Sequence, residues 1–195
     1  MCGFSGYATI DGIVKKDFLI KMKNTLNHRG PDSSGVWNND NVGLTHNRLS
    51  ILDIAKTGSQ PMFSNRYVIC FNGEIYNHLE LRKKLQTEKN FNDFKGTSDT
   101  ETIINFFEFY GIQKSLEHME GMFSLVLYDK LTNELILARD RFGEKPLYYG
   151  FNNKNFYFSS ELKALKAHPE FFPKINHDAL SQFFKFSYIE APQSI

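Results

Sequence analysis

The spacing of apolar residues along the chain predicts a small set of helices. Between residues 15 and 26, apolar side chains recur every three or four positions, as on one face of a helix, and Gly30-Pro31 follows soon after. Residues 78–85 also show helical spacing. Ser98-Asp99-Thr100-Glu101 forms a capping box ahead of apolar residues that continue at helical spacing to Tyr110. We therefore expect helices over 15–26, 78–85 and 98–110.

Short runs of β-type residues predict the strands. These runs cover residues 2–9, 42–44, 49–52, 67–71, 122–128, 134–138, 147–151 and 155–158. The strands come in groups with hairpin spacing, and the helices stand apart from them. This order favours an α+β layered sandwich over a parallel sheet in which strands and helices alternate.

The end of the chain has a different character. Residues 176–189 carry aromatic and aliphatic side chains in close succession, and Ala191-Pro192 ends this pattern. Two interpretations are open, namely a C-terminal helix docked on the domain or the start of a connection to a second domain.

Composition and charge limit the class of protein. The chain has 195 residues, of which 41% are hydrophobic, 15% aromatic and 23% charged, as in a globular domain with a sizeable core. With 23 basic and 22 acidic residues the net charge is +1, which is too small to attract nucleic acid or an anionic membrane. No stretch approaches the roughly 20 apolar residues of a membrane span. Residues 1–7 lack the basic leader of a signal peptide, so we expect a cytosolic protein.

The cysteines and histidines predict neither a metal site nor a disulfide framework. Cys2 and Cys70 are too few for a set of disulfides or a four-cysteine zinc site. The six histidines lack the spacing of a zinc-binding helix. The sequence also contains neither a Walker A phosphate loop nor a dinucleotide-binding fingerprint. We therefore expect no cofactor in this chain.

Cys2 has the chemistry of a nucleophile that carries its own base. A small second residue favours removal of Met1 by methionine aminopeptidase, and the mature chain would then start with both a thiol and a free α-amine. A thiol of pKa about 8.5 is mostly protonated at neutral pH, whereas an α-amine of pKa about 7.7–8.0 is partly neutral and can accept its proton. The alternative interpretation of Cys2 is a small buried apolar residue on an edge strand.

Asn72-Gly73 follows an apolar strand and allows two interpretations. Asn-Gly is the strongest short signal for a hairpin turn. Alternatively, the Asn72 side-chain amide and the Gly73 N–H form an oxyanion hole, in which one donor contributes about 2.7–4 kcal/mol to transition-state stabilisation.

Two charged residues also allow a structural and a functional interpretation. Arg48, at the head of an apolar run, is either a solvated side chain at a strand end or a fork for a substrate carboxylate. Asp99, in the first turn of a predicted helix, either interacts with the helix dipole or faces a substrate ammonium. Together, an arginine and a carboxylate would suit an α-amino acid.

A series of short motifs resembles the N-terminal glutaminase domain of glutamine-dependent asparagine synthetases. These are class II glutamine amidotransferases, within the N-terminal nucleophile hydrolases. The motifs occur in the family order at residues 1–3, 28–35, 48–53, 60–61, 72–77, 98–101, 121–123, 138–143, 145–149 and 160–165. Each motif is short, but their combination is highly specific.

The resemblance implies a fold and a set of roles. The fold would be a four-layer αββα sandwich of two antiparallel sheets, with residues 2–170 as the amidotransferase domain. Cys2 would be the nucleophile, and Asn72 and Gly73 the oxyanion hole. The substrate, L-glutamine, would be held by Arg48 through its α-carboxylate. The rest of the amino acid would be bound by Leu49, Ser50, Ile51, Leu52, Asn72, Gly73, Glu74 and Asp99.

The sequence departs from complete asparagine synthetases in one respect. It lacks the SGG-x-DS pyrophosphate loop of their C-terminal domain, to which we assign the use of ATP and Mg²⁺. We expect residues 171–195 to be a connector toward such a domain or subunit, and a homodimer is possible. Glu144 stands where many members have an aliphatic residue, so the nitrogen acceptor is open. The alternatives are the glutaminase half of a sugar- or surface-polysaccharide-modifying enzyme and a non-catalytic docking domain.

Overall fold

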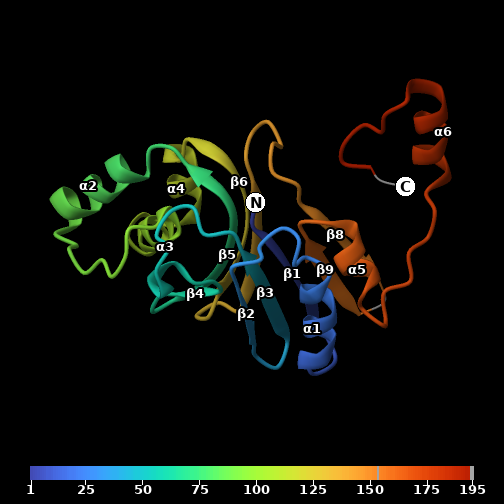
Figure 1. Ribbon diagram of the computed structural model, residues 1–195, viewed down its shortest axis with the longest axis horizontal. Helices are drawn as coiled ribbons and strands as arrows, with labels where there is room; N and C mark the ends of the chain where they lie inside the picture. The colour runs from blue at the N-terminus through green and yellow to red at the C-terminus, as the bar shows by residue number, and fades with distance from the viewer. Residues whose placement is uncertain (153, 194–195) are drawn as a thin grey trace.

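The computed structural model describes residues 1–152 and 154–193 as an α+β fold built on two antiparallel sheets (Figure 1). In the first sheet the strand order is β2-β3-β1-β9-β8, and in the second it is β4-β5-β6-β7. The strands of the first sheet are β1 (Gly3–Thr9), β2 (Ser33–Asn38), β3 (Val42–Arg48), β8 (Tyr148–Asn152) and β9 (Asn155–Ser159). Those of the second are β4 (Met62–Phe63), β5 (Tyr67–Ile75), β6 (Gly121–Asp129) and β7 (Glu134–Arg139).

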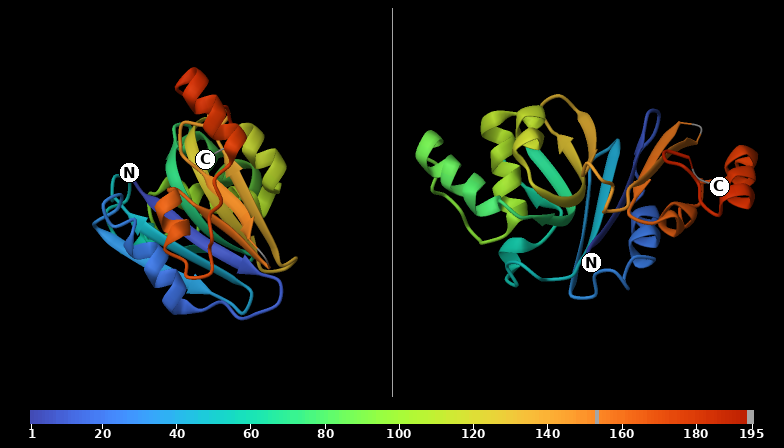
Figure 2. Two further views of the ribbon diagram at one scale, coloured as in Figure 1. Left: turned by 90° about the vertical axis from the view of Figure 1, so that its right-hand side faces the viewer. Right: turned by 90° about the horizontal axis from the view of Figure 1, so that it is seen from above.

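Helices cover the outer faces of both sheets, which confirms the predicted four-layer sandwich. Figure 2 shows the layers edge-on, with α1 and α5 outside the first sheet and α2, α3 and α4 outside the second. The helices are α1 (Lys16–Asn24), α2 (His78–Lys89), α3 (Asp99–Tyr110), α4 (Ile112–His118), α5 (Leu162–Lys166) and α6 (His177–Phe186), and η1 (Lys56–Gly58) is a 3-10 turn. In the part of the chain just described, no helix has the length and apolar character needed to cross a bilayer. The cytosolic location stays a prediction.

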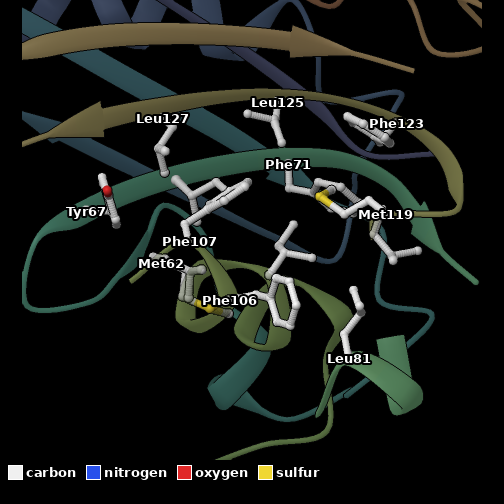
Figure 3. Packing of buried hydrophobic residues seen from close by; sticks show 14 of the residues in the cluster. Met62, Tyr67, Phe71, Leu81, Phe106, Phe107, Met119, Phe123, Leu125 and Leu127 are labelled. Atoms are coloured by element: carbon white, nitrogen blue, oxygen red, sulfur yellow. The ribbon is translucent and has the colours of Figure 1, made fainter. Parts of the chain in front are cut away.

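Three apolar layers hold the sandwich together. The inner layer lies between the sheets and contains buried side chains from β1, β3, β5, β6 and β9. A second layer packs α1 and α5 against the first sheet. The third packs α2, α3 and α4 against the second sheet, and Figure 3 shows Phe106 and Phe107 of α3 lying under Phe71 and Leu125 of the strands.

Strand β5 shows why its sequence is apolar without alternation. Tyr67, Ile69 and Phe71 point toward the helices, whereas Val68 and Cys70 point into the inner layer between the sheets. Successive side chains of a strand face opposite sides, so a strand covered on both faces needs apolar residues at every position. The buried run therefore positions the following residues of β5 in the centre of the molecule.

One predicted strand is wrong. Residues 49–52 form no strand, and the side chain of Ile54, just after them, is 83% exposed. The Arg48 guanidinium donates hydrogen bonds to the carbonyl oxygens of Leu52, Asp53 and Ala55. An extended chain after Arg48 would carry these carbonyl groups out of its reach. The segment therefore curls into a loop, which is named the 49–55 loop below.

The sequence analysis also missed several short elements. Strand β2 has the sequence SSGVWN at the edge of the first sheet and is half-exposed, so it lacks an apolar pattern. Strand β4 and helices α4 and α5 are too short for a periodic signal, with 2, 7 and 5 residues. The boundaries at 2–170 and 171–195 stay predictions. In Figure 1 helix α6 lies at the periphery, and its Phe184 is 78% exposed.

The inner layer generates a prediction for stability. Phe158 is fully buried between the sheets, and its replacement by alanine leaves a cavity in contact with both. We expect Phe158→Ala to lower the free energy of unfolding by about 3–5 kcal/mol in urea denaturation. The matched control is Phe142→Ala, because Phe142 is 90% exposed and should change stability by less than about 0.5 kcal/mol. Equal losses in the two variants would contradict the position of Phe158 in the core.

Candidate functional site

The predicted site residues meet in one cavity between the start of β1, the middle of β5 and the beginning of α3. The predicted residues that line it are Cys2, Arg48, Leu49, Ile51, Leu52, Asn72, Gly73, Glu74 and Asp99. Ser50 lies outside this lining, and its main-chain N–H donates to Asp32 Oδ2 at 2.7 Å. The structure therefore brings together every predicted side chain except that of Ser50.

Cys2 lies half-buried immediately before β1, which is the middle strand of its sheet and not an edge strand. The Leu49 N–H donates to Cys2 Sγ at 3.3 Å, and the thiol faces the Leu49 carbonyl oxygen at 3.5 Å. Burial raises the pKa of the Cys2 thiol, although the Leu49 contact, the chain's amino terminus and the charge of Arg48 act in the opposite direction. The thiol is therefore protonated at neutral pH and needs a base to become a nucleophile.

Asn72 and Gly73 lie inside β5 and not in a hairpin turn. They pair with Ser124 and Phe123 of β6, so the turn interpretation is wrong. Asn72 is 1% exposed, and its Nδ2 has no hydrogen-bond partner among residues 1–152 and 154–193. A buried amide without a partner costs about 1–3 kcal/mol, which makes this donor a candidate for binding a ligand oxygen.

Gly73 is required by the close approach of two strands. A Cβ atom at this position would lie 2.2 Å from the Met122 carbonyl oxygen and 2.6 Å from Phe123 Cα. Both contacts are main-chain atoms, which cannot move aside without separating β5 from β6. Only glycine fits beside β6 here, and it leaves the main chain of β5 bare at the cavity wall.

Arg48 is 5% exposed, which contradicts a solvated side chain at a strand end. Its guanidinium donates to the carbonyl oxygens of Ala55 and Leu52, both at 3.1 Å, and to that of Asp53. Three of the five N–H groups of the side chain are used in these bonds. Arg48 thus holds the 49–55 loop in place and also carries a positive charge into the cavity wall.

Asp99 lies both at a helix start and at the cavity wall, and its role toward a substrate ammonium stays a prediction. It is the first residue of α3, after the cap formed by Ser98, and its side chain also lines the cavity. Its oxygens accept hydrogen bonds from the Ile75 N–H at 3.1 Å and the Thr100 N–H at 2.7 Å. Burial raises the pKa of Asp99, and these two bonds oppose the rise.

Several cavity residues were missed by sequence reasoning. Met1, Gln60 and Lys145 line the cavity, and Lys145 is 6% exposed with its Nζ 3.2 Å from Met1 Sδ. Gln60 and Lys145 fall within the motifs that carry the family resemblance, which was the available signal for them. The other missed residues are Gly58, Phe71, Ser98, Thr100 and Met122.

A network of charges behind Cys2 holds the start of the chain. Arg29 Nε donates to the Cys2 carbonyl oxygen at 2.8 Å, and Arg29 NH1 meets Glu161 Oε1 at 3.0 Å. His28 and Lys163 also contact Glu161, at 2.9 and 3.1 Å. Burial would raise the pKa of Glu161, but the bonds from these three side chains outweigh it and lower the pKa to about 2.

Comparison with known proteins gives a consistent result. The family profile described as "Glutamine amidotransferase domain" matches residues 1–195. The chain is 36% identical over 190 residues to asparagine synthetase [glutamine-hydrolyzing] 3 of Bacillus subtilis, covering 94% of this chain and 30% of the relative. It is 36% identical over 217 residues to putative asparagine synthetase [glutamine-hydrolyzing] 2 of Methanocaldococcus jannaschii, covering 100% of this chain and 41% of the relative. The chain thus spans less than half the length of these relatives.

A solved structure shares the fold. The glutamine phosphoribosylpyrophosphate amidotransferase of Bacillus subtilis, in complex with ADP and GMP, matches with a TM-score of 0.73 at 18% sequence identity. The match covers 89% of this chain and 45% of that protein. At this identity the likeness concerns the fold alone.

The network around Glu161 predicts how stability depends on pH. Its pKa is about 2 in the folded protein against an ordinary 4.5, so the stability it contributes is fully present above about pH 4.5 and is lost as the pH falls toward 2. We expect Glu161→Gln to be less stable than the wild type at pH 7, with a difference that shrinks on acidification. Urea denaturation of both proteins between pH 7 and pH 3 measures this. A difference that stays constant over this range would contradict the assignment.

Proposed function

Because this chain belongs to the glutamine amidotransferase domain family, we propose that it hydrolyses the side-chain amide of L-glutamine and releases ammonia. The observation that carries the proposal is the Asn72 amide nitrogen, which has no hydrogen-bond partner in the described part of the chain and is buried in the same cavity as the Cys2 thiol. Acyl transfer needs a nucleophile and a hydrogen-bond donor for the oxyanion, and this cavity contains a candidate for each.

The proposed reaction starts with the removal of Met1, which frees the α-amine of Cys2. The sulfur of Cys2 bonds to the amide carbon of glutamine while its proton passes to this amine. Asn72 Nδ2 and the Gly73 N–H donate to the oxyanion of the tetrahedral intermediate. The α-ammonium then protonates the nitrogen, the carbon–nitrogen bond breaks and ammonia leaves. Water hydrolyses the remaining γ-glutamyl thioester, which gives glutamate and the free thiol.

The charges of the cavity support recognition of a free α-amino acid. Arg48 would attract the α-carboxylate through the N–H groups that the 49–55 loop leaves unused. Asp99 and Glu74 would attract the α-ammonium, and the main chain of the loop would fill the remaining contacts. A site built around such polar groups rejects an amide that lacks one of them.

For the longer protein we propose transfer of this ammonia to aspartate. The relatives named asparagine synthetase extend well beyond the matched region, and a further domain or subunit would supply ATP and Mg²⁺. Residues 171–195 would connect the two parts. The cytosolic location and a homodimer belong to the same proposal. A different nitrogen acceptor, such as a sugar, is the alternative.

The first test removes the nucleophile. We expect Cys2→Ala to lower the rate of ammonia and glutamate release from glutamine by at least about 10³-fold, because no other group replaces the sulfur. The matched control is Cys70→Ala, since Cys70 is fully buried between the sheets and should keep the activity. Hydrolysis that continues at the wild-type rate in Cys2→Ala would overturn the mechanism. An inactive wild type would support a docking domain instead.

The second test concerns the chain terminus. Met1 turns the α-amine of Cys2 into an amide and places its own side chain in the cavity lining. We expect a preparation that keeps Met1 to be inactive, and a preparation cleaved to start at Cys2 to be active. Intact-mass spectrometry of each preparation, together with its rate of ammonia release, measures the relation. Full activity of a chain that starts with methionine would exclude the α-amine as the base.

A further inference from the structure

Phe71 pairs with Leu125 of β6 on one side of β5, but on the side that faces β4 its main chain is held by two side chains instead of a strand. Strand β4 covers only Val68 and Ile69 of β5 and ends before it reaches Phe71. The Phe71 N–H donates to Gln60 Oε1 at 2.6 Å, and the Phe71 carbonyl oxygen lies 3.0 Å from His46 Nε2. Both groups point to the same side of the strand, so the two side chains take the place of the missing strand partner.

His46 reaches this carbonyl from the other sheet. It is a residue of β3, where it pairs with Phe4 and Gly35, and it has no exposed surface. A carbonyl oxygen accepts hydrogen bonds and donates none, so Nε2 carries the proton and donates to Phe71. The bond therefore joins the first sheet to the second next to the cavity.

His46 keeps this donor over a wide pH range. Burial lowers the pKa of its imidazole to about 4, and the charge of Arg48 adds to the effect, while the bond to Phe71 acts against it. Nδ1 has no partner among the described residues, which fits a neutral ring whose single proton is on Nε2. The protonation of His46, and with it the hydrogen bond to Phe71, therefore stays the same through the neutral pH range.

We propose that His46 is a positioning residue for glutamine hydrolysis, which fixes the oxyanion donors through the carbonyl of Phe71. This inference rests on the proposed function. The Phe71 carbonyl and the Asn72 N–H belong to one planar peptide unit. A hydrogen bond to that carbonyl sets the orientation of the plane from which the Asn72 side chain and the Gly73 main chain continue. On the side of β5 away from β6, where β4 does not reach, His46 holds this plane through the Phe71 carbonyl, while Gln60 holds the preceding peptide unit through the Phe71 N–H. The opposite edge of the plane faces β6, where Asn72 pairs with Ser124.

The size of the expected effect follows from the sensitivity of such donors to position. Loss of one oxyanion donor lowers kcat by about 10²–10³-fold, and a shift of about 1 Å in a reacting group costs about 10²-fold. A donor that is present but free to reorient should lose less. We expect His46→Leu to lower kcat for glutamine by about 10–100-fold, with KM changed by less than about 3-fold.

Conservative variants separate the hydrogen bond from the shape of the side chain. The amide nitrogen of glutamine can reach the place of His46 Nε2, whereas that of asparagine falls short and matches Nδ1. We expect His46→Gln to recover most of the lost kcat and His46→Asn to recover none. Equal activity of the leucine, asparagine and glutamine variants would overturn the proposal, because the bond to Phe71 would then have no effect.

A matched control is provided by a second buried histidine. His168 is 1% exposed, has a pKa lowered to about 4 by burial and packs on Tyr7 and Tyr157 at the outer face of the first sheet. Its ring takes no part in the cavity lining. We expect His168→Leu to lower the melting temperature as much as His46→Leu but to keep the wild-type kcat. An equal fall of kcat in both would show general destabilisation and overturn the proposal.

A reaction that needs no oxyanion hole gives an independent readout. Iodoacetamide alkylates Cys2 when sulfur displaces iodide, and no oxyanion develops in that step. We expect the alkylation rate of Cys2 in His46→Leu to stay within about 2-fold of the wild type while kcat falls. A parallel fall of both rates would place the defect at Cys2 and overturn the proposal. The proposed function is tested separately by the rates of the wild type and of Cys2→Ala, because His46 is unchanged in both proteins.

Discussion

The packing of the two sheets against each other is the interaction on which the rest of the molecule depends. Phe4 and Phe158 of the first sheet meet Val68 and Val126 of the second in a buried apolar layer. The thiol-bearing end of one sheet thereby comes to lie beside the amide-bearing strand of the other, and the cavity is lined by residues of both. Neither sheet has a site of its own, so the chemistry depends on the integrity of this layer.

The sequence predicted the elements whose signals are local. The capping box at Ser98 marked α3 correctly, because a helix start is determined within four residues. Local signals failed where distant partners decide. Asn72-Gly73 is a turn signal by itself, but nine residue pairings between β5 and β6 extend the strand through it. The strand predicted after Arg48 does not form, because the buried guanidinium needs the carbonyl oxygens of the following loop as hydrogen-bond acceptors.

The candidate site likewise contains residues that the sequence indicated and residues that only distant contacts identify. For Cys2 and Asp99 the residues alone favoured a structural interpretation, and only the family resemblance favoured the functional one. His46 was missed because its partner is 25 residues away and belongs to the other sheet. Periodicity reports which face of an element is apolar, and it contains no information about which buried polar atom meets which. Those pairings are set by how the two sheets pack in three dimensions.

The position of Met1 has a consequence for when the protein becomes active. Its sulfur contacts the buried ammonium of Lys145, and its side chain forms part of the cavity wall. On the proposed chemistry, a newly translated chain is a dormant precursor whose first residue obstructs the site and masks the base. Excision of that residue is then an activation step, which opens the site and frees the base together.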